Sequence, residues 1–326
     1  MKRRTFVVGL GATTFTWSSA ARAQQQHRRY RIGFLGDGQS SVLAEWIDSL
    51  RAGLRDLGYI EGQNFELVFR WTEGRSESLP RAAAELVDSN VDVIVTWGTP
   101  GTRAAKEATA RVPIVMSMTG DAVATGLISS LARPGVNVTG MTQFNPELCA
   151  KRLELLKEAF PHMSRVGVLL NPLNPITARN LDAAEQTAKA WGLVLAAFDV
   201  TKTSDIDQAL TKMSTDGTEA IAIFEDPLIM ASGGSIVTRA AARRLPVVGY
   251  LELAPVGALI AYGVSFPEAF RRSAIFIDKI LKGARPEDIP VERPSRFKLI
   301  LNSNAAKSFN FTFPATMLFR ADEVIE

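Results

Sequence analysis

Short apolar runs alternate with amphipathic segments along this chain, and the alternation limits the folds that it can adopt. Residues 91–97 form a nearly continuous apolar run, which is typical of a parallel strand buried on both faces. Residues 41–57 carry apolar side chains at helical spacing and end at Gly58, so they are predicted to form a helix. Strands that alternate with helices predict an α/β fold with helices on both faces of a parallel sheet.

The same order of elements occurs twice. In the first half we expect strands at residues 31–36, 64–71, 91–97 and 113–118, and helices at residues 41–57, 79–89, 100–110 and 122–131. Strands at residues 165–171, 193–200, 219–225 and 245–250 repeat this order about 130 residues later. The repetition predicts two doubly wound, parallel-sheet (Rossmann-like) lobes of the same topology. A single large α/β domain is the alternative.

A shorter unit follows the second set of strands. It comprises predicted strands at residues 257–262 and 297–302 and predicted helices at residues 267–281 and 303–309. A unit of this size is too small for a third domain, so it must pack on one or both lobes. If it completes the first sheet and then returns to the second, several chain crossings join the lobes and form a hinge beside a central cleft.

Residues 1–23 have the parts of an export signal. A basic start, Lys2-Arg3-Arg4, precedes an apolar stretch at residues 6–17, and Ala21-Arg22-Ala23 matches an A-x-A cleavage site. The apolar stretch is too short to span about 30 Å of hydrocarbon, so we expect no membrane anchor. The pair Arg3-Arg4 resembles that of twin-arginine leaders, with the general secretory route as the alternative. The mature protein is therefore expected to be soluble and periplasmic.

The charge of the chain argues against nucleic acid as a partner. The formal net charge of +3 includes four basic residues, and no acidic one, from the leader at residues 1–23. The remaining chain is close to neutral and has no electrostatic footprint for nucleic acid. One cysteine and two histidines also argue against a metal cluster.

No motif for a cofactor or for catalysis is complete. Gly33-x-x-Gly36-x-Gly38 follows a strand but lacks the spacing of a dinucleotide-binding loop. The chain has no G-x-S-x-G nucleophile motif, and residues 98–102 lack the Gly-Lys-Ser/Thr of a nucleotide-binding loop. Cys149 lies at helical spacing and His162 lies in a connection, so both are interpreted as structural. We therefore expect no cofactor and no catalytic residues.

Polar loops rich in glycine or proline follow six of the predicted strands. Ligands of doubly wound sheets bind beyond the carboxyl ends of the strands, and here these ends would face each other across the cleft. Half of the loops lead into helix N-termini, whose free N–H groups favour an anion such as a carboxylate. The expected ligand-binding residues are Asp37, Gln39, Ser40, Gly98, Thr99, Thr102, Thr119, Asp121, Asn171, Asn174, Asp226, Tyr250, Glu252 and Tyr262.

The hydroxyl groups among these residues are expected to hold the carboxylate of a ligand. Ser40, Thr99 and Thr102 would donate to it together with nearby backbone N–H groups. For residues 98–102, a plain helix cap is the alternative interpretation.

The acidic and aromatic residues are expected to meet the rest of the ligand. Asp226 and Glu252 would contact an ammonium group if the ligand carries one. Tyr250 and Tyr262 would cover an apolar or aromatic body, whereas Trp97 fits either the cleft or the core.

A set of motifs spans nearly all of residues 30–326 and carries a family resemblance. It comprises Leu57-Gly-Tyr-Ile-Glu-Gly-Gln-Asn64, Gly98-Thr-Pro100, Gly120-Asp121, Thr125-Gly-Leu127, Ser130-Leu-Ala-Arg-Pro-Gly-Val-Asn-Val-Thr-Gly140, Lys151-Arg-Leu-Glu-Leu-Leu-Lys157 and Asp278-Lys-Ile-Leu-Lys-Gly283. As a set, these motifs resemble the tryptophan/tyrosine-type substrate-binding proteins of ABC transporters. The chain departs from the family pattern at Ala122 and Val136, where proline and glycine are usual.

The resemblance implies a type I periplasmic binding protein fold with three crossings between the lobes. Lobe 1 would comprise residues 30–143 and 258–291, and lobe 2 residues 144–257 and 292–326. It also implies a non-enzymatic, monomeric receptor that delivers a small solute to the transmembrane subunits of an ABC permease. The solute would be a carboxylate or an amino acid, aromatic ones included.

Two other functions stay open at this point. An exported α/β enzyme could act on a small carboxylate through Asp121, Asp226 and Glu252. A ligand-sensing receptor module could instead pass its signal to a membrane kinase.

Overall fold

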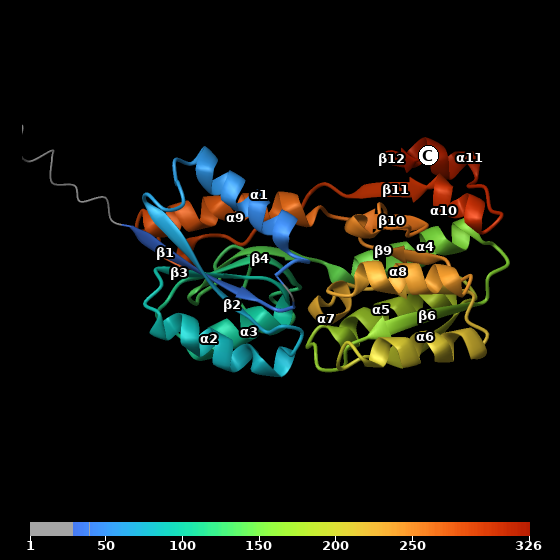
Figure 1. Cartoon of the computed structure of the whole chain (residues 1–326), viewed down its shortest axis with the longest axis horizontal. Helices are drawn as coiled ribbons and strands as arrows, with labels where there is room; N and C mark the ends of the chain where they lie inside the picture. Colours follow the sequence, from blue (N-terminus) through green and yellow to red (C-terminus); the bar gives the residue numbers. More distant parts are fainter. Residues whose placement is uncertain (1–28, 39) are drawn as a thin grey trace, which may run out of the picture.

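The computed structural model describes residues 29–38 and 40–326. These residues form two α/β lobes that lie side by side along the long axis of the molecule, each with its own sheet (Figure 1). The two lobes confirm the predicted fold class. The expected export signal at residues 1–23 and the candidate ligand-binding residue Gln39 lie outside the described residues.

Lobe 1 has a parallel sheet with the strand order β2-β1-β3-β4-β5. Its strands are β1 (Tyr30–Gly36), β2 (Phe65–Trp71), β3 (Val93–Thr96), β4 (Ile114–Gly120) and β5 (Val138–Gln143). Helices α1 (Ala44–Asp56) and α9 (Phe266–Leu281) cover one face, and α2 (Leu79–Asp88) and α3 (Gly98–Ala108) cover the other (Figure 1). Short 3₁₀ turns at η1 (Ser76–Ser78) and η3 (Pro286–Asp288) complete the lobe. Every residue of β3 is buried, as expected for a central parallel strand.

Lobe 2 has a sheet with the strand order β12-β11-β10-β9-β8-β6-β7, in which β10 and β11 form the antiparallel pair. Its strands are β6 (Arg165–Leu170), β7 (Val194–Asp199), β8 (Ala220–Ile223), β9 (Val247–Gly249), β10 (Ile260–Gly263), β11 (Lys298–Asn302) and β12 (Glu323–Ile325). Its helical segments are α4 (Asn145–Ala159), α5 (Thr177–Ala190), α6 (Asp205–Thr215), α7 (Pro227–Met230), α8 (Gly233–Ala242), η2 (Leu251–Leu253), α10 (Ser303–Ser308) and α11 (Ala315–Arg320).

The chain passes between the lobes three times. It leaves lobe 1 between β5 and α4, returns between β10 and α9, and leaves again between η3 and β11. The last stretch of lobe 1 is fastened to β5, because the N–H of Glu292 donates to the carbonyl of Gly140 and the N–H of Thr142 donates to the carbonyl of Glu292. The three crossings therefore lie close together and form the hinge.

The expected lobe boundary before residue 258 is wrong. Strand β10 pairs with β9 and β11 in the sheet of lobe 2, so the return to lobe 1 occurs only at Phe266, where α9 begins. Helix α9 then packs against α1 and β4 of lobe 1. This difference could not be predicted, because an apolar strand fits either sheet.

Two further expectations about local structure differ from the structure. Residues 122–131 form turns rather than the predicted helix, and the carboxylate of Asp121 accepts a hydrogen bond from the N–H of Ala124 in the first turn. Strand β5 was not predicted, because it contains Gly140. A Cβ atom at that position would lie 2.2 Å from the carbonyl oxygen of Met116, so the close pairing of β5 with β4 requires glycine.

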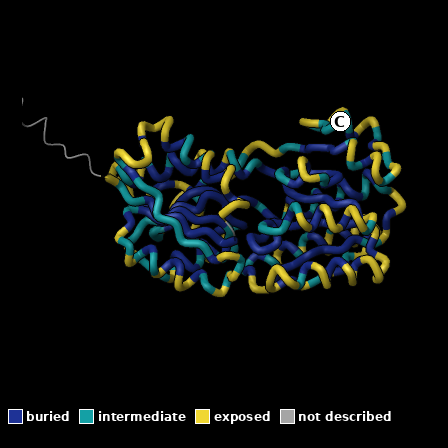
Figure 2. Tube along the Cα trace, viewed as in Figure 1, coloured by how far each residue is buried: buried dark blue, intermediate teal, exposed yellow. Residues whose placement is uncertain are grey.

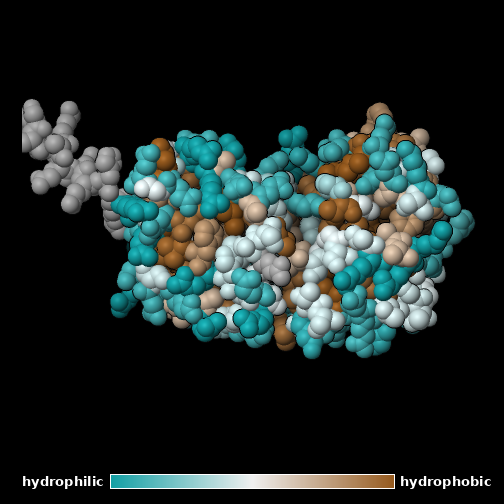
Figure 3. All heavy atoms as spheres, in the orientation of Figure 1, coloured by the Kyte–Doolittle hydropathy of each residue, from teal (hydrophilic) through white to brown (hydrophobic). Residues whose placement is uncertain are grey.

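Burial follows the layered architecture. The strands are largely buried, whereas the helices expose their outer sides (Figure 2). Helix α1 shows the pattern in detail, because Trp46, Ile47, Leu50 and Leu54 are buried at helical spacing. The face of the molecule in Figure 3 is mostly hydrophilic, with small apolar clusters on both lobes. Within the described ranges, no helix has both the length and the apolar character needed to cross a membrane.

Candidate functional site

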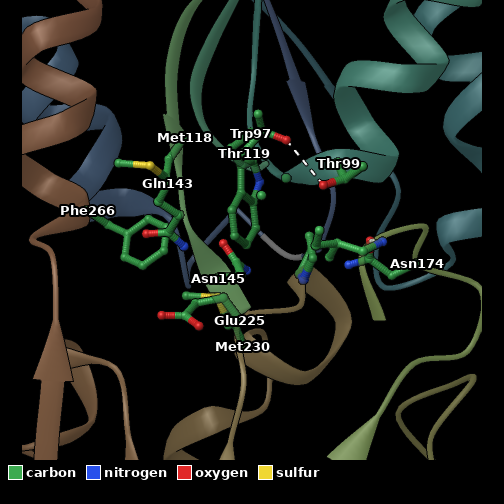
Figure 4. A pocket seen from close by; sticks show the side chains of 14 residues that line it. Trp97, Thr99, Met118, Thr119, Gln143, Asn145, Asn174, Glu225, Met230 and Phe266 are labelled. Atoms are coloured by element: carbon green, nitrogen blue, oxygen red, sulfur yellow. Dashed lines mark hydrogen bonds between the residues drawn. The ribbon is translucent and has the colours of Figure 1, made fainter. Parts of the chain in front are cut away.

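A pocket lies between the two lobes, at the carboxyl ends of their strands. The space between its lining residues, including the part that is open to solvent, is about 290 Å³. Lobe 1 and the start of α9 contribute Trp97, Gly98, Thr99, Met118, Thr119, Gly120, Gln143 and Phe266, and lobe 2 contributes Asn145, Asn174, Ile176, Glu225, Pro227 and Met230. Figure 4 shows side chains from both lobes around this one space.

Two aromatic rings form an apolar wall of the pocket. Phe266 stacks on Trp46 with ring centroids 4.7 Å apart, and Trp97 meets Trp46 edge to face at 5.3 Å. Trp97 and Phe266 also meet edge to face at 6.4 Å. Trp46 on α1 contacts both rings, so ring packing from behind holds Trp97 and Phe266 at the pocket.

Three buried polar atoms at the pocket have no hydrogen-bond partner within the described structure. They are the indole Nε1 of Trp97, the Oε1 of Gln143 and the Oδ1 of Asn145. A buried polar group without a partner costs about 1–3 kcal/mol. Native proteins bury few such groups, and a cluster of them around one pocket indicates that a ligand supplies the missing partners.

The N-terminus of α3 opens into the same pocket. Its N-cap residue, Trp97, offers no side-chain acceptor, so the N–H groups of the first turn lack a side-chain cap. Gly98 and Thr99 of this turn line the pocket, and the hydroxyls of Thr99 and Thr119 lie 3.2 Å apart (Figure 4). Free N–H groups and the positive end of the helix dipole make this wall suitable for an anionic group.

The opposite wall carries a carboxylate. Among the described residues that line the pocket, only Glu225 is ionisable. It is 5% exposed, and the fully buried Arg152 on α4 holds it at distances of 2.5 and 2.8 Å. The attraction of Glu225 outweighs the effect of burial and raises the pKa of Arg152 above its ordinary value.

Comparison with known proteins agrees with this geometry. Residues 39–325 match the family model for ABC transporter substrate-binding proteins. The chain belongs to this family. It is a family of binding proteins rather than enzymes, and its members serve ABC transporters outside the cytoplasmic membrane. The resemblance seen in the sequence motifs and the transport function that it implied are therefore confirmed.

Individual relatives of this substrate-binding protein cover most of its length. The tyrosine-binding protein of Clostridioides difficile (strain R20291) is 26% identical over 258 residues, which is 79% of this chain and 74% of the relative. An ABC domain from Streptococcus pneumonia, solved in complex with L-Trp, is 25% identical with a TM-score of 0.83. A conserved domain protein from Vibrio cholerae O1 biovar El Tor is also 25% identical, with a TM-score of 0.85. Both structures cover 91% of this chain over their whole length.

Four of the residues expected to bind ligand line the pocket of this substrate-binding protein. They are Gly98, Thr99, Thr119 and Asn174. Thr102 lies one turn further along α3, and its hydroxyl donates to the carbonyl of Gly98 within the helix, so it neither lines the pocket nor caps α3.

Three other expected residues lie directly behind the pocket lining. The carboxylate of Asp226 caps α7 and accepts hydrogen bonds from Asn171 and Asn174, at 3.1 and 2.8 Å. Tyr250 packs edge to face against Phe266, and its hydroxyl lies 3.4 Å from the carbonyl of Met230. These residues position the lining rather than forming it.

Glu252 also lies behind the lining. Its Oε1 accepts the N–H of Phe266 at 3.0 Å, whereas its Oε2 is buried without a partner in the described structure. Burial raises the pKa of Glu252 to about 7. The hydrogen bond joins lobe 2 to the start of α9 in lobe 1.

The remaining expected residues lie apart from the pocket. Asp37 is buried at the end of β1, where its carboxylate accepts hydrogen bonds from Thr72 and Ser76. Ser40 lines a separate surface hollow with Phe69 and Trp71. Asp121 and Tyr262 also lie away from the pocket lining. The carboxylate of Asp121 caps the turn after β4, and the ring of Tyr262 stacks on Phe297 with ring centroids 6.2 Å apart.

The pocket lining includes three polar residues that were not expected from the sequence, Gln143, Asn145 and Glu225. Gln143 and Asn145 flank the first crossing, and they were overlooked because β5 was not predicted. Glu225 lies in a loop that was singled out, but its neighbour Asp226 was chosen instead. Phe266 directly precedes the predicted helix at residues 267–281, and nothing in the sequence places it beside Trp97.

Proposed function

We propose that this substrate-binding protein binds a small solute with a carboxylate and an aromatic or apolar body in the pocket between its lobes. The cluster of unpartnered buried atoms of Trp97, Gln143 and Asn145 carries the proposal, because all three residues line the space between the two lobes. Gly98, Thr99, Thr119 and Asn174 belong to the proposed site, with Asn171, Asp226, Tyr250 and Glu252 as its support.

The carboxylate of the solute would bind at the N-terminus of α3. There the N–H groups of the first turn and the hydroxyl of Thr99 are donors without a competing side-chain cap. Trp97 adds its indole N–H from the N-cap position. No cationic side chain lines this part of the described pocket, so backbone dipoles and hydroxyls would stabilise the anion.

The body of the solute would lie against the aromatic wall. Trp97 and Phe266 offer ring faces or edges, and Met118 and Met230 offer flexible apolar surface that adapts to an aromatic ring. Two relatives support this assignment: one is named as a tyrosine-binding protein, and the other was solved in complex with L-Trp.

Binding would favour the closed arrangement of the lobes, because only that arrangement brings both walls of the pocket to the ligand. The closed monomer would then dock on the transmembrane subunits of an ABC permease and release its solute there. The leader at residues 1–23 would direct export to the periplasm by the twin-arginine route.

Thermal unfolding with candidate solutes tests the proposal. L-Tryptophan and L-tyrosine are compared with 3-(indol-3-yl)propanoate and 3-(4-hydroxyphenyl)propanoate, which lack the amine, and with tryptamine, which lacks the carboxylate. A ligand at 100 times its Kd stabilises the folded state by about 2.7 kcal/mol. We expect at least one of the carboxylates to raise the melting temperature and tryptamine to have no effect. If tryptamine stabilises the protein as well as the acids do, the carboxylate site at α3 is wrong.

A further inference from the structure

The ion pair behind the pocket is built from a fully buried arginine. Arg152 is the largest of the fully buried side chains in the described part of the chain. Its Nη1 and Nη2 donate to the two carboxylate oxygens of Glu225, at 2.8 and 2.5 Å. Its Nε donates to the carbonyl of Tyr262 at 2.9 Å, and Nη1 also reaches the carbonyl of Ile223 at 3.3 Å. The guanidinium is therefore fixed on several sides.

Stability alone does not account for this pair. Removing two charges from water costs several kcal/mol for each ion, and apolar residues of similar volume often stabilise a protein as well as a buried ion pair does. The pair also connects α4 to β8 and β10 through the carbonyls of Ile223 and Tyr262, and its carboxylate partner, Glu225, lines the pocket. This position points to a role in ligand binding.

The two partners differ in what they present to the pocket. Glu225 lines the pocket, whereas Arg152 lies behind Glu225. The N–H groups of Arg152 donate to Glu225 and to two backbone carbonyls. Asn145 and Gln143 also line the pocket, and the Oδ1 of Asn145 and the Oε1 of Gln143 are buried acceptors without partners in the described structure. The pocket lining therefore includes three acceptor groups, one of them the carboxylate of Glu225. An ammonium group, with three N–H donors and a positive charge, matches such a lining.

We propose that Glu225, held in place by the positioning residue Arg152, selects solutes that carry an ammonium group. This inference rests on the proposed function and narrows it. The pocket then binds aromatic amino acids and discriminates against aromatic acids of the same shape that lack the amine. An amine-free acid would leave Glu225, Asn145 and Gln143 unpaired, and unpaired buried groups are the strongest basis for rejecting an isostere.

Other titratable groups near Glu225 set the conditions of a test. Cys149 lies on α4 with Arg152, and Tyr250 and Glu252 lie around η2. Burial raises the pKa of Cys149 and of Tyr250, so both are neutral over the working range. Burial raises the pKa of Glu252 to about 7, and the charge of Glu225 contributes to this shift. The variants therefore also affect Glu252, so the two ligands of each pair are compared at the same pH in every variant.

Isothermal titration of the Glu225→Gln variant is the first test. The probes are L-tryptophan and 3-(indol-3-yl)propanoate, with L-tyrosine and 3-(4-hydroxyphenyl)propanoate as a second matched pair. We expect the wild-type protein to bind one amino acid about 10–100-fold more tightly than its amine-free counterpart, the range of one charge-assisted hydrogen-bonded contact. Glu225→Gln should lose most of this preference and keep its affinity for the amine-free acid. Glu154→Gln, on the exposed side of α4, is the matched control and should bind like wild type.

Arg152→Met separates a positioning role from a merely structural one. Without its counter-charge, a buried carboxylate takes up a proton, so the variant should bind the amino acid more weakly at pH 6 than at pH 8.5. The same change of pH should have less effect on wild type and on Lys151→Met, the exposed neighbour on α4. Equal losses of affinity for the amino acid and for the amine-free acid, at both pH values, would overturn the role of Arg152.

The outcomes distinguish this inference from the proposed function. If the wild-type protein binds an amine-free acid as tightly as its amino acid, or if Glu225→Gln keeps the preference, the pocket is a carboxylate site without an amine selector. The proposed function then stands and the inference is wrong. If wild type binds none of the four probes, both are wrong.

Discussion

Gly98 of lobe 1 packs so closely against Pro227 of lobe 2 that a Cβ atom at position 98 would lie 2.5 Å from the Cγ of the proline. Both residues line the pocket, and Gly98 opens α3 with a φ of 70°. The proline ring cannot swing aside as a flexible side chain would. The two lobes are therefore in contact at the N-terminus of α3, and the described structure is a closed arrangement.

Gly98→Ala should impair closure. The added methyl group clashes with Pro227 only when the lobes are closed, so the variant should shift the population towards the open form. We expect at least about a tenfold loss of affinity for the solute, since each 1.4 kcal/mol of hindered closure costs a factor of ten. The measurement is isothermal titration with the best probe from the thermal screen, together with the radius of gyration in solution with and without that probe.

Gly126→Ala is the matched control for backbone strain. Gly126 also lies in lobe 1 and has a φ of 71°, but no heavy atom lies within 4 Å of an added Cβ. Both variants should lose about 1–2 kcal/mol of stability from the left-handed conformation. Only Gly98→Ala should lose affinity. Equal affinity losses would mean that strain, and not a clash between lobes, explains the effect.

Much of the fold could be predicted from the sequence because parallel α/β lobes have a clear pattern. The continuous apolar run that became β3 and the run with helical spacing that became α1 are the two patterns that define the class. The lobe that receives β10 could not be predicted, because its four residues are apolar or small and fit either sheet. Its place is decided by pairing with β9 and β11, which are distant in the sequence.

The site was predictable only where backbone geometry defines it. Gly98 and Thr99 follow a strand and open a helix, so their place at a strand end was evident from local pattern. Arg152 and Phe266 have no such local pattern, because each lies on an amphipathic helix whose sequence indicates only packing against a sheet. Their roles arise from contacts with Glu225 and Trp97, which only the assembled lobes create.

Thr99 and Thr102 lie one helical turn apart, and the structure assigns them different roles. Thr99 lines the pocket, whereas the hydroxyl of Thr102 donates a hydrogen bond to the carbonyl of Gly98 at 2.9 Å. Thr99→Val should lower the affinity for the solute about 3–10-fold, which corresponds to the loss of one hydrogen bond. Thr102→Val, of the same size and on the same helix, should leave the affinity within about twofold. Titration calorimetry of both variants decides between them, and a larger loss in Thr102→Val would contradict the assignment.

Asp37 should make the protein less stable as the pH rises. Burial, with a further contribution from the charge of Asp226, raises its pKa to about 6, although hydrogen bonds from Thr72 and Ser76 oppose this shift. An unfolded aspartate titrates near about 3.9, so between about pH 4 and pH 6 the folded state binds the additional proton. The free energy of unfolding should therefore fall across this window as the pH rises, by about 1–3 kcal/mol.

The Asp37→Asn variant removes the free-energy cost of burying an ionised carboxylate and keeps an acceptor oxygen for Thr72 and Ser76. It should be more stable than wild type at pH 7.5 and similar to wild type at pH 4.5, as measured by urea unfolding. Asp48→Asn, at a well exposed position on α1, is the control and should show no such difference between the two pH values. A variant that is less stable than wild type at both pH values would show that the hydrogen bonds, and not the buried charge, dominate at this position.

Trp97→Phe tests whether the unpartnered indole N–H serves the ligand. Phenylalanine keeps a ring that can face Trp46 and Phe266 but removes Nε1, which is buried without a partner in the described structure. If that N–H donates to the bound solute, the variant should lose about 2–10-fold in affinity, the value of one hydrogen bond. Trp191→Phe, at a half-exposed position on lobe 2, should change neither affinity nor closure. Should Trp97→Phe bind its best ligand as tightly as wild type, the indole N–H would have no part in recognition, and the anion would have to be held by α3 alone.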